Sequence, residues 1–242
     1  MKTWPDLSIV LSAMLTVYDR AAAQTPPVEL FLSAEQVIDL SAAIDAPYGV
    51  LVTFAAYSGL RAGEIGGLRV GRLDLLRAKV DVAEALKDTA GRLHFGPTKN
   101  HERRTVRLPR FLCHLLGAYL AGRPNGSSDL VFTSPQGAPL RHNAFYRRQF
   151  KPAVAAAGLP SELRFHDLRH TCAALLIAQG AHPRAIMERL GYSSITVTID
   201  TYGHLFPALD EALSDGLERT YQAARANRNE TSCGADVVQI GS

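Results

Sequence analysis

The hydrophobic period of the sequence changes once, and this change limits the folds open to the chain. Before and after a central block, apolar residues recur at helical spacing, as in "YGVLVTFAAYSG" and "HDLRHTCAALLIAQG". Between Val70 and Pro109, the segments "AKVDVAEAL", "GRLHFGP" and "RTVRLP" instead alternate apolar with polar residues. Such alternation is typical of half-buried antiparallel strands. We therefore predict a mainly α fold with one small antiparallel β-sheet inserted, which is the α+β class.

Capping and breaking residues set the predicted helix limits. Residues 1 to about 25 have a helical pattern that ends at two consecutive prolines, because proline cannot continue the hydrogen-bond ladder. Ser33 and Gln36 form a capping-box signature, and Gly59 is the expected end of the apolar helix before it. Further helices are predicted at about 109–121, 143–157, 166–179, 183–190 and 205–224, with a loop of β-branched residues after the fourth.

The domain organisation follows from these limits. Residues 1–28 are predicted to form an N-terminal helix and linker, residues 29–225 one globular domain, and residues 226–242 a flexible tail without helical period. A chain of 242 residues, 47% of them hydrophobic, has enough apolar surface for one sizeable core.

Cysteine use and hydropathy predict a cytoplasmic protein. The three cysteines are far apart and odd in number, which argues against a disulfide framework and against a cysteine-pair zinc site. No stretch reaches the roughly 18 apolar residues of a spanning helix, and the N-terminus lacks the pattern of a secretory signal. We therefore expect neither membrane insertion nor secretion.

Basic residues gather in two groups. The first runs from residue 92 to residue 110 with Glu102 as its single acid, and the second, "RHNAFYRRQFK", contains no acid. Either group alone could be an ordinary solvated face. Together they favour a polyanionic partner such as double-stranded DNA, whose backbone phosphates attract such groups. The basic residues are Arg92, Lys99, Arg103, Arg104, Arg107 and Arg110 in the first group, and Arg141, Arg147, Arg148 and Lys151 in the second.

The cluster "HDLRH" can be interpreted in two ways. Its two histidines have the spacing of the zinc motif H-E-x-x-H, but Asp167 replaces the glutamate base, no third ligand is signalled, and Arg169 would place a fixed charge beside the metal. A phosphate site explains the cluster better, with Arg169 binding phosphate oxygens and His166 moving a proton. Arg61 could contribute to that site from the turn after Gly59; the alternative is a structural pair with Glu64.

Four sequence motifs follow one another along the chain. "SGLRAGEIGGLRV", "PTKNHERRTVRLP", "HDLRHT" and "LGYSSITVTIDTYGH" resemble the motifs of the tyrosine recombinase (phage integrase) family, from about Phe31 to Phe206. The resemblance implies the catalytic-domain fold of that family. It also implies DNA breaking and rejoining through a covalent 3′-phosphotyrosyl intermediate, without a metal, ATP or other cofactor.

The resemblance assigns roles residue by residue. It implies that Arg61 and Arg169 clamp the scissile phosphate, that Tyr202 attacks it, and that Lys99 protonates the leaving 5′ oxygen. His166 is the expected proton acceptor. Supporting roles fall to Glu64, which steadies the arginine region, and to His170. The expected DNA contacts are Arg103, Arg104, Arg147, Arg148 and Lys151.

Two features depart from the family pattern. Tyr192, which is also expected among the catalytic residues, stands where the family usually has histidine or tryptophan; a phenol can donate a hydrogen bond to phosphate but carries no positive charge. The segment before the catalytic region is short, so residues 1–28 resemble a remnant of the family's core-binding domain. Two interpretations stay open: an active recombinase of a mobile element that self-associates on DNA as a synaptic tetramer, or a catalytically weakened or inactive DNA-binding remnant.

Overall fold

The computed structural model describes residues 30–98, 103–206 and 209–233. The predicted N-terminal helix, Lys99 and residues 234–242 lie outside the described residues. The helices are α2 (Ala34–Ala43), α3 (Tyr48–Ser58), α4 (Ala62–Gly66), α5 (Arg110–Ala121), α6 (His142–Phe145), α7 (Lys151–Ala156), α8 (Asp167–Ala178), α9 (Pro183–Leu190), α10 (Ile195–Tyr202) and α11 (Leu209–Cys233). Short 3₁₀ turns η1 (Val70–Arg72) and η3 (Gly203–Leu205) and a π-helical turn η2 (Tyr146–Phe150) complete the helical part. The strands are β1 (Leu73–Asp74), β2 (Lys79–Val82), β3 (Glu84–Thr89), β4 (Arg92–Pro97) and β5 (Arg104–Arg107).

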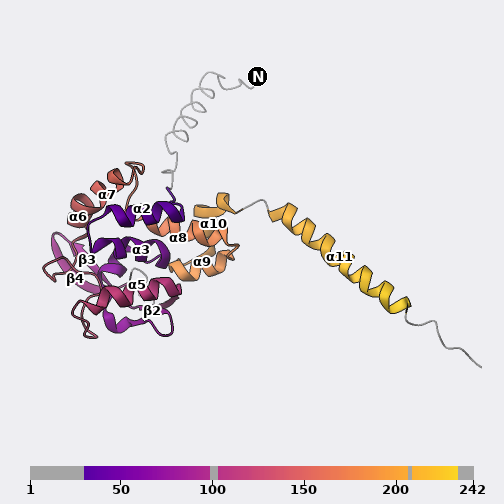
Figure 1. The fold of residues 1–242 in the computed structure, drawn as a ribbon, viewed down its shortest axis with the longest axis horizontal. Coiled ribbons are helices and arrows are strands. Elements are labelled where there is room, and N and C mark those ends of the chain that lie inside the picture. The colour runs from indigo at the N-terminus through magenta and orange to yellow at the C-terminus, as the bar shows by residue number, and fades with distance from the viewer. Residues whose placement is uncertain (1–29, 99–102, 207–208, 234–242) are drawn as a thin grey trace, which may run out of the picture.

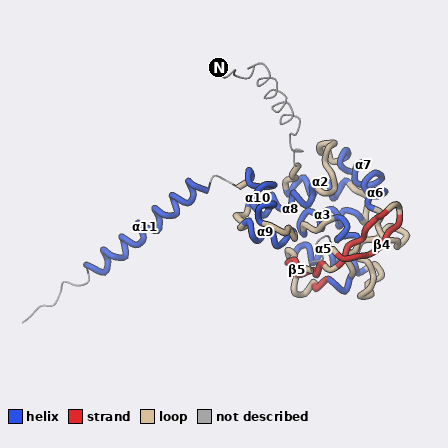
Figure 2. The backbone as a smooth tube through the Cα atoms, turned by 180° about the vertical axis from the view of Figure 1, so that it is seen from behind, coloured by secondary structure: helices blue, strands red, loops and turns tan. Residues whose placement is uncertain are grey.

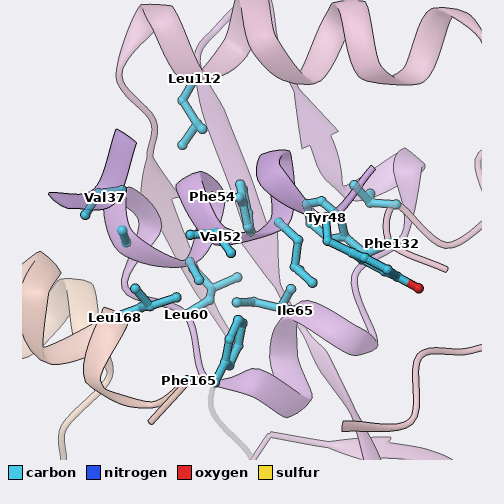
Figure 3. Packing of buried hydrophobic residues seen from close by; sticks show 14 of the residues in the cluster. Val37, Tyr48, Val52, Phe54, Leu60, Ile65, Leu112, Phe132, Phe165 and Leu168 are labelled. Carbon is cyan, nitrogen blue, oxygen red and sulfur yellow. The ribbon is translucent and has the colours of Figure 1, made fainter. Parts of the chain in front are cut away.

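Helix α3 is the centre of the body and packs against α2, α5 and α8 (Figure 1). Its near-continuous apolar sequence is explained by this position, because Leu51, Val52 and Phe54 are all buried although they point in different directions around the helix. Figure 3 shows Phe54, Leu60 and other apolar side chains meeting below α5. The predicted capping box at Ser33 is confirmed, with the Ser33 hydroxyl accepting a hydrogen bond from the amide of Gln36 at 3.2 Å.

The inserted β block forms two small antiparallel sheets where one was predicted. Strands β1, β2 and β5 form a three-stranded sheet, in which the buried residues Val80 and Val106 lie opposite one another. Strands β3 and β4 form a separate hairpin. The chain leaves the first sheet at Ala83, and β3 then packs against α4, where Leu86 and Ile65 are buried.

Helix α10 corrects the predicted loop of β-branched residues. Ser194 caps the helix by accepting a hydrogen bond from the amide of Thr196 at 3.1 Å. Isoleucine, valine and threonine lower helix propensity only slightly, so tertiary packing can override it. Thr198 and Tyr202, four residues apart on one face, are both buried, and α10 packs against α9.

Helix α11 extends away from the body in Figures 1 and 2. It begins later than predicted and continues past residue 226 to Cys233. An apolar period is not required of a helix without a buried face, and the alanine, arginine and glutamine residues of "YQAARANRNE" favour helix by propensity. Two large apolar side chains on it are exposed, Leu217 at 71% and Tyr221 at 62%. Among the described helices, none combines the length and apolar character that crossing a membrane requires.

The end of α3 generates a stability prediction. Gly59 has a φ of 72°, and a Cβ there would lie 2.6 Å from Leu190 Cδ2 and 3.1 Å from Cys172 Sγ. We expect Gly59→Ala to lower the free energy of unfolding by about 2–4 kcal/mol, combining left-handed strain with overpacking. Gly180→Ala is the matched control, because Gly180 has a φ of 75° with no atom within 4 Å of an added Cβ. Urea unfolding should show a loss of only about 1 kcal/mol for the control; equal losses would contradict the role of the Leu190 contact.

Candidate active site

Arg61 lies in the turn between α3 and α4 and is held at three points. Its backbone amide donates to Glu64 Oε2 at 2.9 Å, and its Nη1 donates to Glu64 Oε1 at 3.0 Å. Its Nη2 donates to the carbonyl oxygen of Gly191, 130 residues further along the chain, at 2.8 Å. The Arg61 side chain is 22% exposed. The turn therefore presents a partly accessible guanidinium group from a rigid support, while the predicted alternative, a pair with Glu64, is present as well.

Arg169 projects from the first turn of α8 and is buried, with 2% of its surface exposed. Its Nη1 donates to the carbonyl of Gly59 and its Nη2 to the carbonyl of Leu190, each at 2.6 Å. Its guanidinium carbon lies 4.9 Å from the ring centre of Tyr192. Burial lowers the pKa of Arg169, but an arginine in a protein keeps its charge. A fixed positive charge thus lies directly behind the Leu190–Tyr192 turn.

Glu64 is the buried carboxylate of the site, with 2% exposure. Burial by itself raises the pKa of Glu64, but hydrogen bonds and positive charge from Arg104, followed by those of Arg61, outweigh it and lower the pKa. The Nη1 and Nη2 of Arg104 donate to the two carboxylate oxygens at 2.9 and 2.7 Å. Arg104 was predicted as a DNA contact; the structure directs its guanidinium group inward, to Glu64.

Tyr202 lies at the end of α10 and is fully buried. Its hydroxyl is 2.8 Å from Nδ1 of His170 and 3.2 Å from the hydroxyl of Tyr192. Because Tyr192 also stacks on Arg169, a continuous chain of contacts joins Tyr202 to the arginines. The structure thus brings together the predicted residues of four distant segments, with Tyr202 on the inner side of the group.

His166 and His170 are one helical turn apart, and their ring centres are separated by 5.1 Å. Part of His166 is exposed, but desolvation of its ring, followed by electrostatic interaction with His170 and Arg169, lowers its pKa to about 4. Desolvation also lowers the pKa of His170. Both imidazoles are therefore neutral near pH 7 and able to accept a proton. His170, predicted as a supporting residue, is the histidine that contacts Tyr202.

In the described residues, the two-histidine spacing is not accompanied by further grouped metal ligands. The carboxylate of Asp167 is bound by Arg164, with Nη2 and Oδ1 at 2.7 Å, and is not directed at the histidines. In the part of the chain that the structure describes, no three histidine, cysteine, aspartate or glutamate side chains are grouped to hold a metal ion. The spacing instead places His170 on Tyr202 and His166 beside it.

The remaining predicted DNA contacts lie outside this group. Arg147 and Arg148 are exposed on η2, which lies between α6 and α7 in the sequence, and those helices are on the opposite side of the body from α9 and α10 (Figure 2). The ammonium group of Lys151 donates to the carbonyl of Ser161. Arg103 is exposed beside residues 99–102, which include Lys99 and lie outside the described residues.

The carbonyl groups at the end of α9 accept hydrogen bonds from the arginines of the site, which was not predicted from the sequence. The last carbonyls of a helix have no partner within the helix and must find one elsewhere. Here Gly191, in the left-handed region with a φ of 66°, ends α9, and the carbonyls of Leu190 and Gly191 bind Arg169 and Arg61. The "LG" pair before Tyr192 was the available signal, because glycine after a helix marks such an end.

Comparisons with known proteins show which sequences resemble this chain. Residues 31–208 match the phage integrase family. The chain is 32% identical to the ICEBs1 integrase of Bacillus subtilis over 176 residues, which is 69% of this chain and 47% of that protein. It is also 32% identical to the putative prophage phiRv2 integrase of Mycobacterium tuberculosis over 191 residues, which is 74% of this chain and 48% of that protein.

Solved structures show the same fold. The Tn1549 transposon integrase in complex with circular intermediate DNA has a TM-score of 0.69 at 21% identity, covering 81% of this chain and 68% of that one. The XerA recombinase has a TM-score of 0.60 at 24% identity, covering 81% and 67%. The present chain spans about half the length of the two integrases above. From the match over residues 31–208 and the convergence of its motifs, the chain belongs to the phage integrase family of tyrosine recombinases.

Proposed function

We propose that this chain is the catalytic part of a site-specific DNA recombinase of the integrase type, which breaks and rejoins DNA through a covalent 3′-phosphotyrosyl intermediate. One observation carries the proposal. Arg61 and Arg169 both reach the Leu190–Gly191 turn, and the Tyr202 hydroxyl is joined to Arg169 through Tyr192. Two guanidinium groups and a phenol around one position are what phosphoryl transfer to tyrosine requires.

Binding of DNA exchanges one set of acceptors for another. In the DNA-free structure, Nη2 of Arg61 and Nη2 of Arg169 are occupied by the carbonyls of Gly191 and Leu190. A phosphate oxygen is charged and forms the stronger hydrogen bond with a guanidinium group. The scissile phosphate therefore displaces these carbonyls, and the Leu190–Tyr192 turn shifts with them. Tyr202, on the helix that follows this turn, moves out of its buried position to reach the phosphorus.

The chemical step conserves bond energy. The Tyr202 oxygen forms a bond to phosphorus as the bond from phosphorus to the 5′ oxygen breaks, and the arginines stabilise the charge that develops on the other phosphate oxygens. The phenolic proton passes to a neutral histidine, His170 at its present contact or His166 after Tyr202 moves. Lys99 protonates the departing 5′ oxygen, the role that its motif implies. Attack of a new 5′ hydroxyl on the phosphotyrosine reverses these steps and needs no ATP.

The alternative function is a DNA-binding remnant without cleavage activity. Two observations favour it: Tyr192 replaces a side chain that is usually histidine or tryptophan in the family, and Tyr202 is fully buried. In either case we propose that the partner is double-stranded DNA, whose backbone the exposed Arg103, Arg147 and Arg148 contact together with Lys151.

Covalent trapping separates the two functions. We expect the wild-type chain to form an adduct, stable in denaturing detergent, with a library of nicked duplexes randomised around the nick. Tyr202→Phe should abolish this adduct and change the dissociation constant for DNA less than about 3-fold, because only the nucleophilic oxygen is lost. Tyr119→Phe, a partly buried tyrosine of α5, is the control that keeps the adduct. An adduct that survives in Tyr202→Phe excludes Tyr202 as the nucleophile, and a wild-type chain that binds DNA without adduct supports the remnant.

The histidines generate a pH prediction. Since the pKa of His166 is lowered to about 4, this imidazole can accept a proton well below pH 6.5, and the pKa of His170 is lowered in the same direction. We expect the single-turnover cleavage rate to stay nearly constant from pH 8 down to about pH 5; a fall centred near 6.5, the value for a free histidine, would contradict neutral histidines. The same lowered pKa makes the stability of the fold depend on pH. The unfolded state binds more protons between the two pKa values, so the contribution of His166 is present above pH 6.5 and is lost as the pH falls toward 4.

We propose further that α11 of one copy docks on the catalytic domain of a second copy. Leu217 and Tyr221, one turn apart, form an unpartnered apolar stripe on the projecting helix. A cavity of about 360 Å³ at the surface of the body offers a receptor that is mainly but not wholly apolar; its lining includes Ala34, Tyr57, Leu108, Leu175 and Leu176 together with Arg107, Gln179 and Arg189. Self-association through this contact buries both surfaces.

Substitution on α11 tests this contact. We expect the double variant Leu217→Asp and Tyr221→Asp to reduce the number of copies bound per duplex to one, as measured by mass photometry on DNA, with an unchanged melting temperature. Arg219→Asp, on the opposite face of the helix, is the control and should assemble normally. Assembly that persists in the double variant would exclude this stripe as the contact.

A further inference from the structure

Three arginines bind three consecutive carbonyls at the end of α9. Nε of Arg104 donates to the carbonyl of Arg189 at 3.1 Å, Nη2 of Arg169 to that of Leu190 at 2.6 Å, and Nη2 of Arg61 to that of Gly191 at 2.8 Å. The C-terminal end of a helix carries a partial negative charge, which such cations stabilise. Arg61 and Arg169 belong to the proposed phosphate clamp. Arg104 makes the same kind of contact but lies on a strand, β5.

Arg104 also completes the surroundings of Glu64. Its two terminal nitrogens bind both carboxylate oxygens, and the two side chains are 13% and 2% exposed. The same carboxylate binds the backbone amide and Nη1 of Arg61. A buried carboxylate that loses one of its cations is left partly uncompensated and rearranges or takes up a proton. The position of the Arg61 guanidinium group therefore depends on Arg104 through the carboxylate that the two arginines share.

The guanidinium group of Arg104 lies against the turn that carries Tyr192. A Cβ added at Gly191 would be 3.0 Å from Cζ, Nε and Nη1 of Arg104. This close approach fixes the distance between β5 and the end of α9. The orientation of Arg104 is therefore determined from two sides, by Glu64 and by the Arg189–Gly191 backbone.

We propose that Arg104 is a positioning residue of the cleavage site, which holds Arg61, through Glu64, and the end of α9 in one fixed arrangement. The inference rests on the proposed function and adds to it a residue that acts without touching the phosphate. When phosphate displaces the carbonyls of Leu190 and Gly191, the bond from Arg104 to the Arg189 carbonyl remains. The end of α9 then stays attached while the following turn moves with Tyr192.

The test combines Arg104 with Arg61. We expect Arg104→Gln to lower the single-turnover cleavage rate at saturating DNA by about 100-fold, the loss typical of a misplaced catalytic group, with less than a 3-fold change in the dissociation constant for DNA. Arg104→Lys should remain slow, because an ammonium group keeps the charge but cannot bind both carboxylate oxygens. In an Arg61→Gln background, Arg104→Gln should have no further effect on the rate or on DNA binding, because both changes disable one unit.

Other outcomes overturn the proposal. A direct DNA contact by Arg104 predicts weaker binding, recovery in Arg104→Lys, and effects that add to those of Arg61→Gln. Because the dissociation constant for DNA can be measured without cleavage, a clearly weaker binding by Arg104→Gln would overturn the inference even if the wild-type chain forms no adduct, a result that would instead refute the proposed function. Arg77→Gln is the control, because it removes an arginine–carboxylate pair with Asp74 at the surface, where the Arg77 side chain is 79% exposed. This substitution should change neither the cleavage rate nor the dissociation constant for DNA. Melting temperatures identify any variant that fails to fold, and Arg104→Lys, which keeps the charge, is then the variant on which the test is decided.

Discussion

The buried Glu64 carboxylate is the interaction on which the site depends. It accepts hydrogen bonds from Arg61 in the α3–α4 turn and from Arg104 on β5. A buried charge is tolerated only when it is paired and hydrogen-bonded. Both arginines that pair with Glu64 also bind backbone carbonyls at the end of α9. One carboxylate thus links the α3–α4 turn, β5 and α9 in a single electrostatic unit.

The backbone of the same unit supplies acceptors to the arginines of the site. Without them the guanidinium group of Arg169, which is 2% exposed, would be buried without hydrogen-bond partners at a cost in free energy. The carbonyls of Gly59 and Leu190 satisfy Arg169, and the carbonyl of Gly191 satisfies Arg61. These acceptors belong to the turn that leads to Tyr192 and α10. The acceptors of the arginines and Tyr202 therefore belong to one short stretch of the chain, from Leu190 to the end of α10.

Much of the fold could be predicted from local signals. The capping box at Ser33 and the glycine at the end of α3 are short-range features whose chemistry does not depend on the rest of the chain. Helix α10 could not be predicted in this way, because its β-branched residues have little preference for helix over loop. Burial of Thr198 and Tyr202 as α10 packs against α9 makes the segment helical. The division of the β block into two sheets likewise depends on the packing of β3 against α4.

The sequence by itself determined which residues are the candidates for the site: three of the four ordered motifs contain Arg61, His166, Arg169 and Tyr202, and the remaining motif contains Lys99. Only the tertiary structure decided what each one contacts. It assigned His170 to the Tyr202 hydroxyl, turned Arg104 inward to Glu64, and supplied the backbone carbonyls of α9 as acceptors. The physical reason is that these contacts join segments 32 to 130 residues apart, so their geometry depends on how whole helices pack rather than on any local pattern.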